Sequence, residues 1–107
     1  MIFEQGDIIE IDFDPTLGCE PQKRRPALVV SSSEFNIATS MTIVCPITSR
    51  MNGFFLHEPL PQGLQVQGEV IMEQVRALDV EARNPRKIET LDQADLEPIL
   101  ICLRSFF

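Results

Sequence analysis

The chain is a succession of short segments with strand character, separated by glycine, proline and other turn formers. The clearest is residues 6–14 (GDIIEIDFD), in which three apolar residues alternate with acidic ones. Alternation with a period of two is typical of a half-buried β-strand. Pro15 ends this strand, and a loop punctuated by Gly18 and Pro21 follows. A chain built from such short units favours a small antiparallel β-fold.

Five further segments have the same character. They are residues 26–32 (PALVVSS), 41–48 (MTIVCPIT), 53–60 (GFFLHEPL), 68–78 (GEVIMEQVRAL) and 86–90 (RKIET). Pro46 favours an edge, a bulge or a strand end for the third strand, because proline cannot donate to a β-ladder. Between the second and third strands, residues 32–36 predict a short helical turn with Ser32 or Ser33 as N-cap.

The C-terminal residues 91–107 change to a helical period. The apolar residues that share one helical face are Leu96, Ile99, Leu100, Leu103 and Phe107. Asp92 is a plausible N-cap, but a helix beginning there would hold Pro98 in its interior, at a cost of about 3 kcal/mol. We therefore expect the regular helix to begin near Asp95, or to be kinked. The whole pattern predicts one mainly β (α+β) domain over residues 1–107, an antiparallel barrel with a C-terminal helix.

Charge narrows the classes of function. A net charge of −7 argues against a protein that coats nucleic acid without specificity. It leaves room for a local basic site, because Lys23, Arg24 and Arg25 are consecutive. No apolar run reaches the roughly 20 residues that cross a bilayer, and the first residues lack the pattern of a signal peptide. We expect a cytoplasmic protein that does not bind membranes.

Three cysteines form an odd set without C-x-x-C spacing: Cys19, Cys45 and Cys102. This arrangement predicts reduced, mostly structural thiols. The sequence contains no P-loop, no G-x-G-x-x-G, no metal-ligand cluster and no serine with a convincing histidine partner. We therefore expect neither a cofactor nor a metal. His57 is the only histidine, and we expect it to face solvent at a strand end.

Candidate functional residues stand at the ends of the predicted strands. They are Arg25 before the second strand, Thr48, Ser49 and Arg50 after the third, and Arg76 and Asp79 near the end of the fifth. Arginine combined with a hydroxyl suits the binding of a phosphate and the stabilisation of charge on it. From residue types alone, scattered solvated arginines are the alternative interpretation.

Five motifs in order resemble the MazF/PemK family of toxin endoribonucleases from toxin–antitoxin modules. They are GDI at 6–8, D-P-T-x-G-x-E at 14–20, Arg-Pro opening a valine-rich strand at 25–30, P-I-T-S at 46–49 and E-Q-V-R-A-L-D at 73–79. The resemblance runs from about residue 5 into the C-terminal helix. It implies an SH3-like barrel of the PemK/CcdB toxin fold, a homodimer, and a cognate antitoxin that neutralises the toxin. It also implies metal-independent cleavage of single-stranded RNA, with the ribose 2′-hydroxyl as nucleophile.

The resemblance also implies roles for residues. Arg25 and Thr48 would be catalytic: Arg25 would hold the scissile phosphate and could supply a proton to the leaving 5′ oxygen, while Thr48 would hydrogen-bond the phosphate. The high pKa of a guanidinium favours electrostatic stabilisation over proton donation. The residues expected to bind RNA are Lys23 and Arg24 on the loop, Ser49, Arg50, Arg76 and Asp79. Arg76 and Asp79 could instead form a structural ion pair, and Cys19 stands where some relatives have histidine.

Two other functions are compatible with this pattern. One is a gyrase-poisoning toxin of the same fold, although the ending RSFF lacks the tryptophan of that related family. The other is a catalytically silent barrel that only binds an antitoxin. An acidic total charge is compatible with a basic RNA groove at a dimer interface, because screening over ~10 Å at 0.1 M salt makes the local charge decisive.

Overall fold

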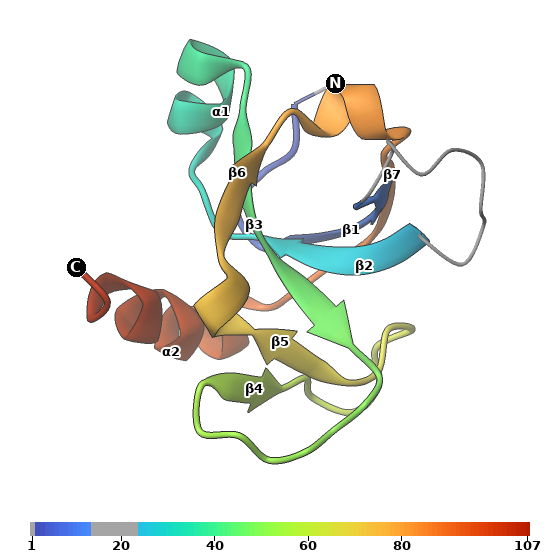
Figure 1. The fold of residues 1–107 in the computed structure, drawn as a ribbon, viewed down its shortest axis with the longest axis vertical. Coiled ribbons are helices and arrows are strands. Elements are labelled where there is room, and N and C mark those ends of the chain that lie inside the picture. The colour runs from blue at the N-terminus through green and yellow to red at the C-terminus, as the bar shows by residue number, and fades with distance from the viewer. Residues whose placement is uncertain (1, 14–23) are drawn as a thin grey trace.

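The computed structural model describes residues 2–13 and 24–107, which form a strongly bent antiparallel sheet with two helices (Figure 1). The elements in chain order are β1 (Asp7–Asp12), β2 (Arg24–Val29), α1 (Ser33–Thr39), β3 (Thr42–Thr48), β4 (His57–Pro59), β5 (Glu69–Ile71), the 3-10 helix η3 (Met72–Gln74), β6 (Arg76–Leu78), the 3-10 helix η4 (Val80–Arg83), β7 (Arg86–Thr90) and α2 (Gln93–Arg104). The strand order is β4-β5-β3-β2-β1-β7, with β6 paired to β3 beside this path. The predicted class, a small antiparallel barrel with a C-terminal helix, is confirmed.

The third strand, β3, is central to the sheet, so of the three alternatives that Pro46 favoured, an edge, a bulge or a strand end, the edge is excluded. One edge of β3 pairs with β2 through Ala27–Pro46, Leu28–Cys45 and Val29–Val44. Its other edge pairs with β6 at residues 42–44 and with β5 at residues 47–48. Pro46 lies between these two pairings. A residue without an N–H is tolerated there because β3 changes partner at that point.

The predicted strand 68–78 is broken in two for the same reason. Residue 70 lies opposite residue 47, and residue 76 lies opposite residue 44. Between these two pairings, one chain has the five residues 71–75, whereas β3 has only Cys45 and Pro46. The extra residues form the 3-10 helix η3, which separates β5 from β6.

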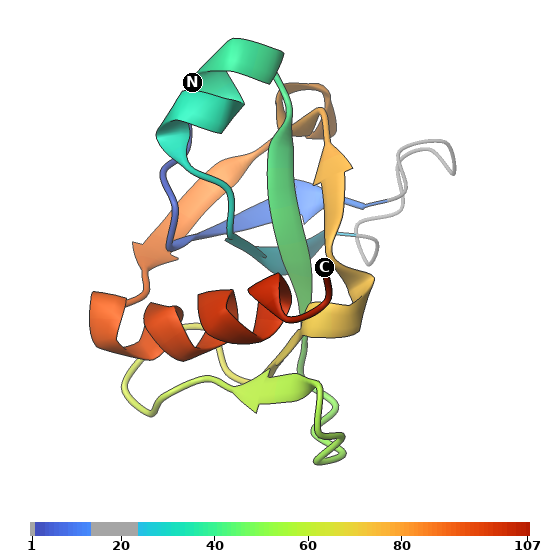
Figure 2. The same cartoon turned by 90° about the vertical axis from the view of Figure 1, so that its left-hand side faces the viewer.

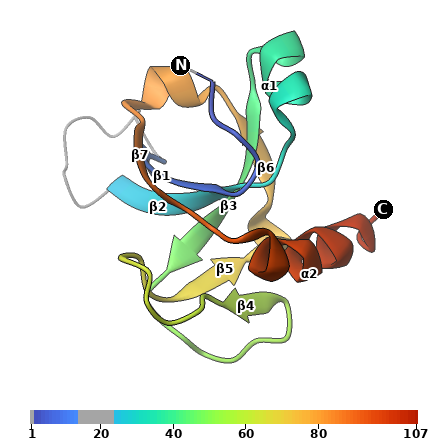
Figure 3. The ribbon, with the colours of Figure 1, turned by 180° about the vertical axis from the view of Figure 1, so that it is seen from behind.

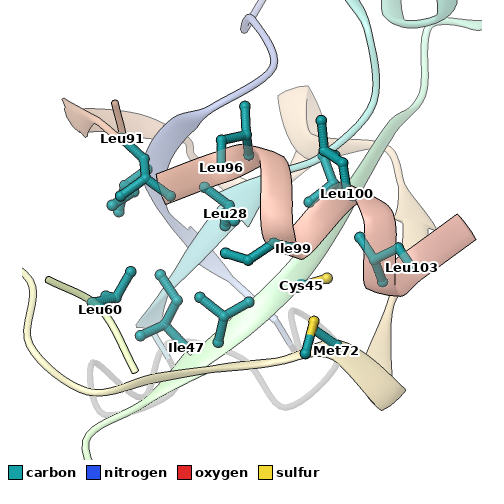
Figure 4. Close-up of a cluster of buried hydrophobic side chains, with 13 residues drawn as sticks. Leu28, Cys45, Ile47, Leu60, Met72, Leu91, Leu96, Ile99, Leu100 and Leu103 are labelled. Atoms are coloured by element: carbon teal, nitrogen blue, oxygen red, sulfur yellow. The ribbon is translucent and has the colours of Figure 1, made fainter. Parts of the chain in front are cut away.

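The long strands β1, β2 and β3 are covered on both faces. One apolar cluster, the helix-side core, packs under α2 and includes Ile8 of β1 and Leu28 of β2 (Figure 4). The other, the inner core, includes Ile9 and Ile11 of β1 and Val44 of β3. The first strand is therefore buried on both faces at residues 8 and 9, rather than half-buried. Double burial fixes the backbone at the ends of these strands, where the candidate residues stand.

The helix α2 lies across the region where the long strands meet the β4–β5 hairpin (Figure 2), and α1 lies at the opposite end of the molecule from that hairpin (Figure 3). The predicted apolar face is confirmed for its four buried members, Leu96, Ile99, Leu100 and Leu103. Phe107 is instead 96 % exposed, because the chain leaves the helix at Arg104 before reaching it.

The predicted start of α2 near Asp95 was also wrong. The helix begins at Gln93 with Asp92 as N-cap, so Pro98 lies inside it. The amides of Asp95 and Leu96 both donate to the Asp92 carbonyl, which closes the first turn. An early start brings Leu96 onto the apolar face in a regular turn, and this burial outweighs the local cost of the proline.

Replacing Pro98 with alanine is expected to raise the free energy of unfolding by about 2 kcal/mol. An alanine amide at this exposed position can donate to the Ala94 carbonyl, which receives no helical hydrogen bond from proline. Urea denaturation of the two proteins measures the difference. An equal or lower stability of Pro98→Ala would show that the helix already compensates for the missing bond.

The cysteines within the described residues are free thiols, as predicted. Cys45 lies in the helix-side core, where burial and, to a smaller extent, the charge of Glu73 raise the pKa of its thiol to about 12. A thiol of this kind is inert at neutral pH. Cys102 is half-buried on α2, and Cys19 lies outside the described residues.

Candidate functional site: an arginine–threonine groove

A groove of about 520 Å³ lies where β2 begins and β3 ends. The residues lining it are Arg24, Arg25, Pro26, Ile47, Thr48, Ser49, Arg50 and Gln67. The structure thus brings together five residues singled out from the sequence. Gln67 and the chain beside it were missed, because nothing in the sequence indicates that the start of β5 meets the end of β3.

The register of β2 and β3 explains why Arg25 and Thr48 meet. Their ladder ends at Ala27–Pro46. Continued by two residues, the same antiparallel register places Arg25 opposite Thr48. Directly opposed residues on one face of such a pair have Cβ atoms about 4.5–5.5 Å apart. A guanidinium and a hydroxyl can therefore reach the same anionic group.

Arg25 is one of two cations of this groove, with Arg50, that are free to bind a ligand. It is exposed, and within the described part of the chain it makes no ion pair. Pairing of its backbone segment with Ile11 of β1 holds it in the sheet. Because a guanidinium presents a planar fork of donors, it can contact two oxygens of one phosphate.

Arg24 is engaged differently, and its predicted position on the loop was wrong because it is the first residue of β2. Its Nε lies 3.2 Å from Glu10 Oε1 and its Nη1 lies 3.1 Å from Asp12 Oδ1. Its Nη2 also donates to the Glu10 carbonyl at 3.3 Å. Arg24 therefore joins β1 to β2 beside Arg25. Lys23, the third member of the basic run, lies outside the described residues.

Thr48 is the last residue of β3, and its Oγ1 accepts a hydrogen bond from the Arg50 amide at 3.1 Å. This contact turns the chain at the groove and leaves the hydroxyl proton available to a ligand. Gly68 packs directly against the same residue: a Cβ at Gly68 would lie 2.0 Å from the Thr48 carbonyl oxygen. Gly68 also has φ +131°, which L side chains rarely adopt.

A buried carboxylate lies beside Thr48 in the sheet. Glu69, paired with Thr48 in the β3–β5 ladder, is 2 % exposed. Its Oε1 lies 3.1 Å from Nδ1 of His57, and its two oxygens accept the amides of Asn52 and Gly53. His57 was expected to face solvent. It is instead largely buried, with Nε2 3.1 Å from Glu73 Oε2.

The pKa values of this cluster shift in opposite directions. Burial disfavours the charged imidazolium, but hydrogen bonds and charges from Glu73 and Glu69 outweigh it and raise the pKa of His57. Burial alone would raise the pKa of Glu69. The hydrogen bond from His57 and those from the amides of Asn52 and Gly53 lower it overall.

These shifts predict a window of maximum stability. The contribution of His57 is fully present below its ordinary pKa of 6.5 and is lost as pH rises through its higher folded-state pKa. The contribution of Glu69 is present above its ordinary pKa of 4.5 and is lost as pH falls through its lower folded-state pKa. Urea unfolding from about pH 4 to about pH 9 should therefore show a loss on the alkaline side that His57→Gln lacks. The same alkaline slope in both proteins would contradict this.

Arg76 and Asp79 do not line the groove. Arg76 begins β6, paired with Val44 near the far end of β3, and its guanidinium carbon lies 5.6 Å from the centre of the Phe13 ring. The proposed ion pair between Arg76 and Asp79 is absent from the described residues. A different arginine, Arg83, fixes the end of β1 by donating to the carbonyls of Asp12 and Phe13.

Over residues 2–13 and 24–107, no group of three or more histidine, cysteine or acidic residues is arranged to hold a metal ion. In the same part of the chain, no helix has both the length and the apolar character needed to span a bilayer.

The fold and the groove together define a class of protein: a small antiparallel barrel whose groove is lined by an arginine and a threonine from the ends of two paired strands. The sequence profile described as "PemK-like, MazF-like toxin of type II toxin-antitoxin system" matches residues 4–107. The chain therefore belongs to this toxin family.

Individual relatives agree with this assignment. The chain is 38 % identical to the endoribonuclease toxin ChpB of Escherichia coli K12, over 96 % of this chain and 92 % of ChpB. It is 33 % identical to the endoribonuclease toxin MazF of the same strain, over 90 % of this chain and 86 % of that protein. The crystal structure of MazF from Deinococcus radiodurans superposes with a TM-score of 0.86 at 31 % identity, over 99 % of this chain and 96 % of that one.

A second structure from D. radiodurans, a MazE–MazF complex, superposes with a TM-score of 0.85 at 28 % identity, over 99 % of this chain and 95 % of that one. The resemblance drawn from the five sequence motifs is thus confirmed. The relatives named here are described as endoribonucleases or as MazE–MazF complexes, so the gyrase alternative gains no support.

Proposed function

We propose that this chain is an endoribonuclease toxin that cleaves single-stranded RNA at short sequences in the arginine–threonine groove and is neutralised by a cognate antitoxin. The observation that supports the proposal is that Arg25 and Thr48, at the ends of the paired strands β2 and β3, line the same groove. Relatives of the same fold that are named endoribonucleases support the assignment. The proposed location is the cytoplasm.

The chemistry follows from the residues of the groove. The ribose 2′-oxygen attacks the adjacent phosphorus, and the bond from phosphorus to the 5′ oxygen breaks. The products are a 2′,3′-cyclic phosphate and a 5′-hydroxyl, with the 2′-hydroxyl proton released and one proton taken up by the leaving oxygen. As negative charge grows on the phosphate oxygens, the contact with the Arg25 guanidinium strengthens. Thr48 donates its hydroxyl proton to a second oxygen.

Electrostatic stabilisation is the main contribution in this proposal. No carboxylate or imidazole is among the described residues that line the groove. Arg50 adds a second cation beside Thr48, and it makes no ion pair with the described residues. Two free cations in one groove attract a polyanion even though the net charge is −7, because more distant acidic residues are screened by salt. Ser49 contributes a further donor. Lys23 stays a predicted RNA contact from the sequence, whereas the charge of Arg24 is already paired with Glu10 and Asp12.

The partners follow from the family. The neighbouring D. radiodurans structure is a MazE–MazF complex, and we extend this arrangement to the present chain as a homodimer that binds an antitoxin chain. An antitoxin that covers the groove would compete with RNA for Arg25. Arg76 and Asp79 do not line the groove, so in this proposal they contact RNA only away from the reacting phosphate.

Incubation of the purified chain with a mixed single-stranded RNA in excess EDTA tests the proposal. We expect cleavage at one short recurring sequence, with 5′-hydroxyl ends whose sequencing gives the recognition sequence, while a matched duplex stays intact. RNA that remains intact overturns the proposal. Intact RNA together with retained antitoxin binding would identify the silent barrel, and trapped gyrase–DNA complexes would identify the gyrase-directed function.

A further inference from the structure

Two phenylalanines are exposed on the loop between β3 and β4. Phe54 is 42 % exposed and Phe55 is 80 % exposed, and neither belongs to the helix-side core or the inner core. Their ring centroids lie 4.9 Å apart at an interplanar angle of 60°. Paired aromatic rings that remain in water are costly for a folded chain, so they mark a surface that binds something.

The loop that carries these rings is held in place by hydrogen bonds. Glu69 accepts the amides of Asn52 and Gly53 at 3.3 Å each, and the side chain of Asn52 accepts the Phe54 amide at 3.0 Å. The His57 amide donates to the Phe54 carbonyl at 2.9 Å. The Phe54 ring also meets His57 edge-on, at 5.3 Å between centroids. Since the rings are already placed, a ligand binds them with a small loss of conformational entropy.

The same loop starts inside the groove. Ser49 and Arg50 line the groove, and Phe54 follows Arg50 by four residues. Even a fully extended chain would separate their Cα atoms by at most about 14 Å. A strand of RNA with its phosphate at Arg25 therefore needs only a few nucleotides to reach the rings, within the span that single-strand binding sites commonly cover.

The charges around Phe54 and Phe55 favour an uncharged nucleobase over a phosphate as the ligand of these rings. The imidazole of His57, which meets the Phe54 ring, is paired with two carboxylates, Glu69 and Glu73, so the charged cluster beside the rings has no excess of positive charge. These groups disfavour a phosphate at the rings, whereas the free cations Arg25 and Arg50 attract one in the groove. An uncharged nucleobase with two apolar faces fits the exposed aromatic pair.

We propose that Phe54 and Phe55 form a stacking subsite for an unpaired nucleobase of the RNA whose scissile phosphate lies in the arginine–threonine groove. The inference rests on the proposed function. It adds to that function a surface that binds a nucleobase near the cleaved bond. Stacking of one base on an aromatic side chain contributes about 1–3 kcal/mol, which corresponds to roughly 5- to 150-fold in affinity.

The test measures binding of an oligonucleotide that contains the cleaved sequence and carries a 2′-deoxy sugar at the cleavage point, so that it cannot react. Replacing Phe55 with alanine should weaken binding by about 5-fold or more, by fluorescence anisotropy. Phe55→Trp should retain affinity, whereas Phe55→Leu, which is apolar without an aromatic face, should behave like alanine. Ile37→Ala, which removes a 64 % exposed apolar side chain from α1, is the matched control.

The possible outcomes separate the two proposals. Wild-type protein that neither binds nor cleaves RNA overturns both. Wild-type cleavage with unchanged binding by Phe55→Ala, or full affinity in Phe55→Leu, overturns the stacking subsite alone. A loss of affinity for the antitoxin with RNA affinity intact would assign the aromatic pair to a protein partner and also overturn it. Thermal unfolding of each variant should match wild type, because Phe55 is exposed and lies outside both cores.

Discussion

Replacing Arg25 with alanine should lower the rate of RNA cleavage by about 10²–10³-fold, which corresponds to roughly 3–4 kcal/mol of transition-state stabilisation. The guanidinium is a free cation in the same groove as Thr48, and in the proposed mechanism its contact is strongest when charge accumulates on the phosphate. Because Arg25 is exposed and unpaired within the described residues, its removal should leave the thermal unfolding of the protein nearly unchanged. Single-turnover cleavage of a defined oligonucleotide gives the rate.

Two further variants make the Arg25 result specific. Arg25→Lys keeps the charge without the planar fork, so it should recover only part of the lost rate. Arg86→Ala removes an arginine side chain that is 65 % exposed on β7, outside the groove, and should cleave at the wild-type rate. Cleavage by Arg25→Ala at the wild-type rate would remove Arg25 from the proposed mechanism.

Replacing Gly68 with alanine should have the largest effect on stability of any substitution at the site. The new Cβ would overlap the Thr48 carbonyl oxygen at 2.0 Å, and backbone rather than a flexible side chain would have to move. An alanine at φ +131° would also be strained. We therefore expect the free energy of unfolding to fall by about 3 kcal/mol or more. Because Thr48 is the residue displaced, cleavage by the folded fraction should fall as well.

Gly63→Ala is the matched control for Gly68→Ala. Gly63 lies in the same connection between β4 and β5 and has φ +98°, but a Cβ there would meet nothing within 4 Å. Only the conformational cost remains, about 1–2 kcal/mol, with cleavage retained. Urea denaturation and cleavage assays on both variants distinguish the two causes. Equal losses would show that the contact with Thr48 is not responsible.

The strand-end positions of Arg25 and Thr48 could be predicted from local sequence, whereas their role as catalytic candidates came from the resemblance to the toxin family. Arg25 and Thr48 adjoin apolar strands whose position follows from their own residues, and the antiparallel pairing of those strands brings the two together. The supporting residues were not predictable in this way. Gln67, Gly68 and Glu69 meet the end of β3 only because β3 changes partner at Pro46, and a change of partner leaves no local pattern.

Two further errors show the limit of local reasoning. His57 follows the apolar residues 54–56 and precedes Glu58, and this local pattern does not reveal its partners; Glu69 and Glu73 are 12 and 16 residues away. The start of α2 was misplaced because the local cost of Pro98 was weighed without the burial that four apolar side chains gain against the sheet. In both cases, tertiary contacts outweighed a local preference.

β3 pairs with β2 on one edge and with β5 on the other, and residues next to both pairings line the groove. These two sets of lining residues can therefore change independently in evolution. Arg25 and Thr48 stand on strands enclosed by two apolar cores, where most substitutions would be removed by selection for folding. Gln67, which also lines the groove and is exposed, belongs to the connection between the three-residue strands β4 and β5, and connections tolerate more sequence change than the elements that they join. A lineage of such proteins could therefore change the RNA sequence that it recognises while keeping the same bond-breaking chemistry.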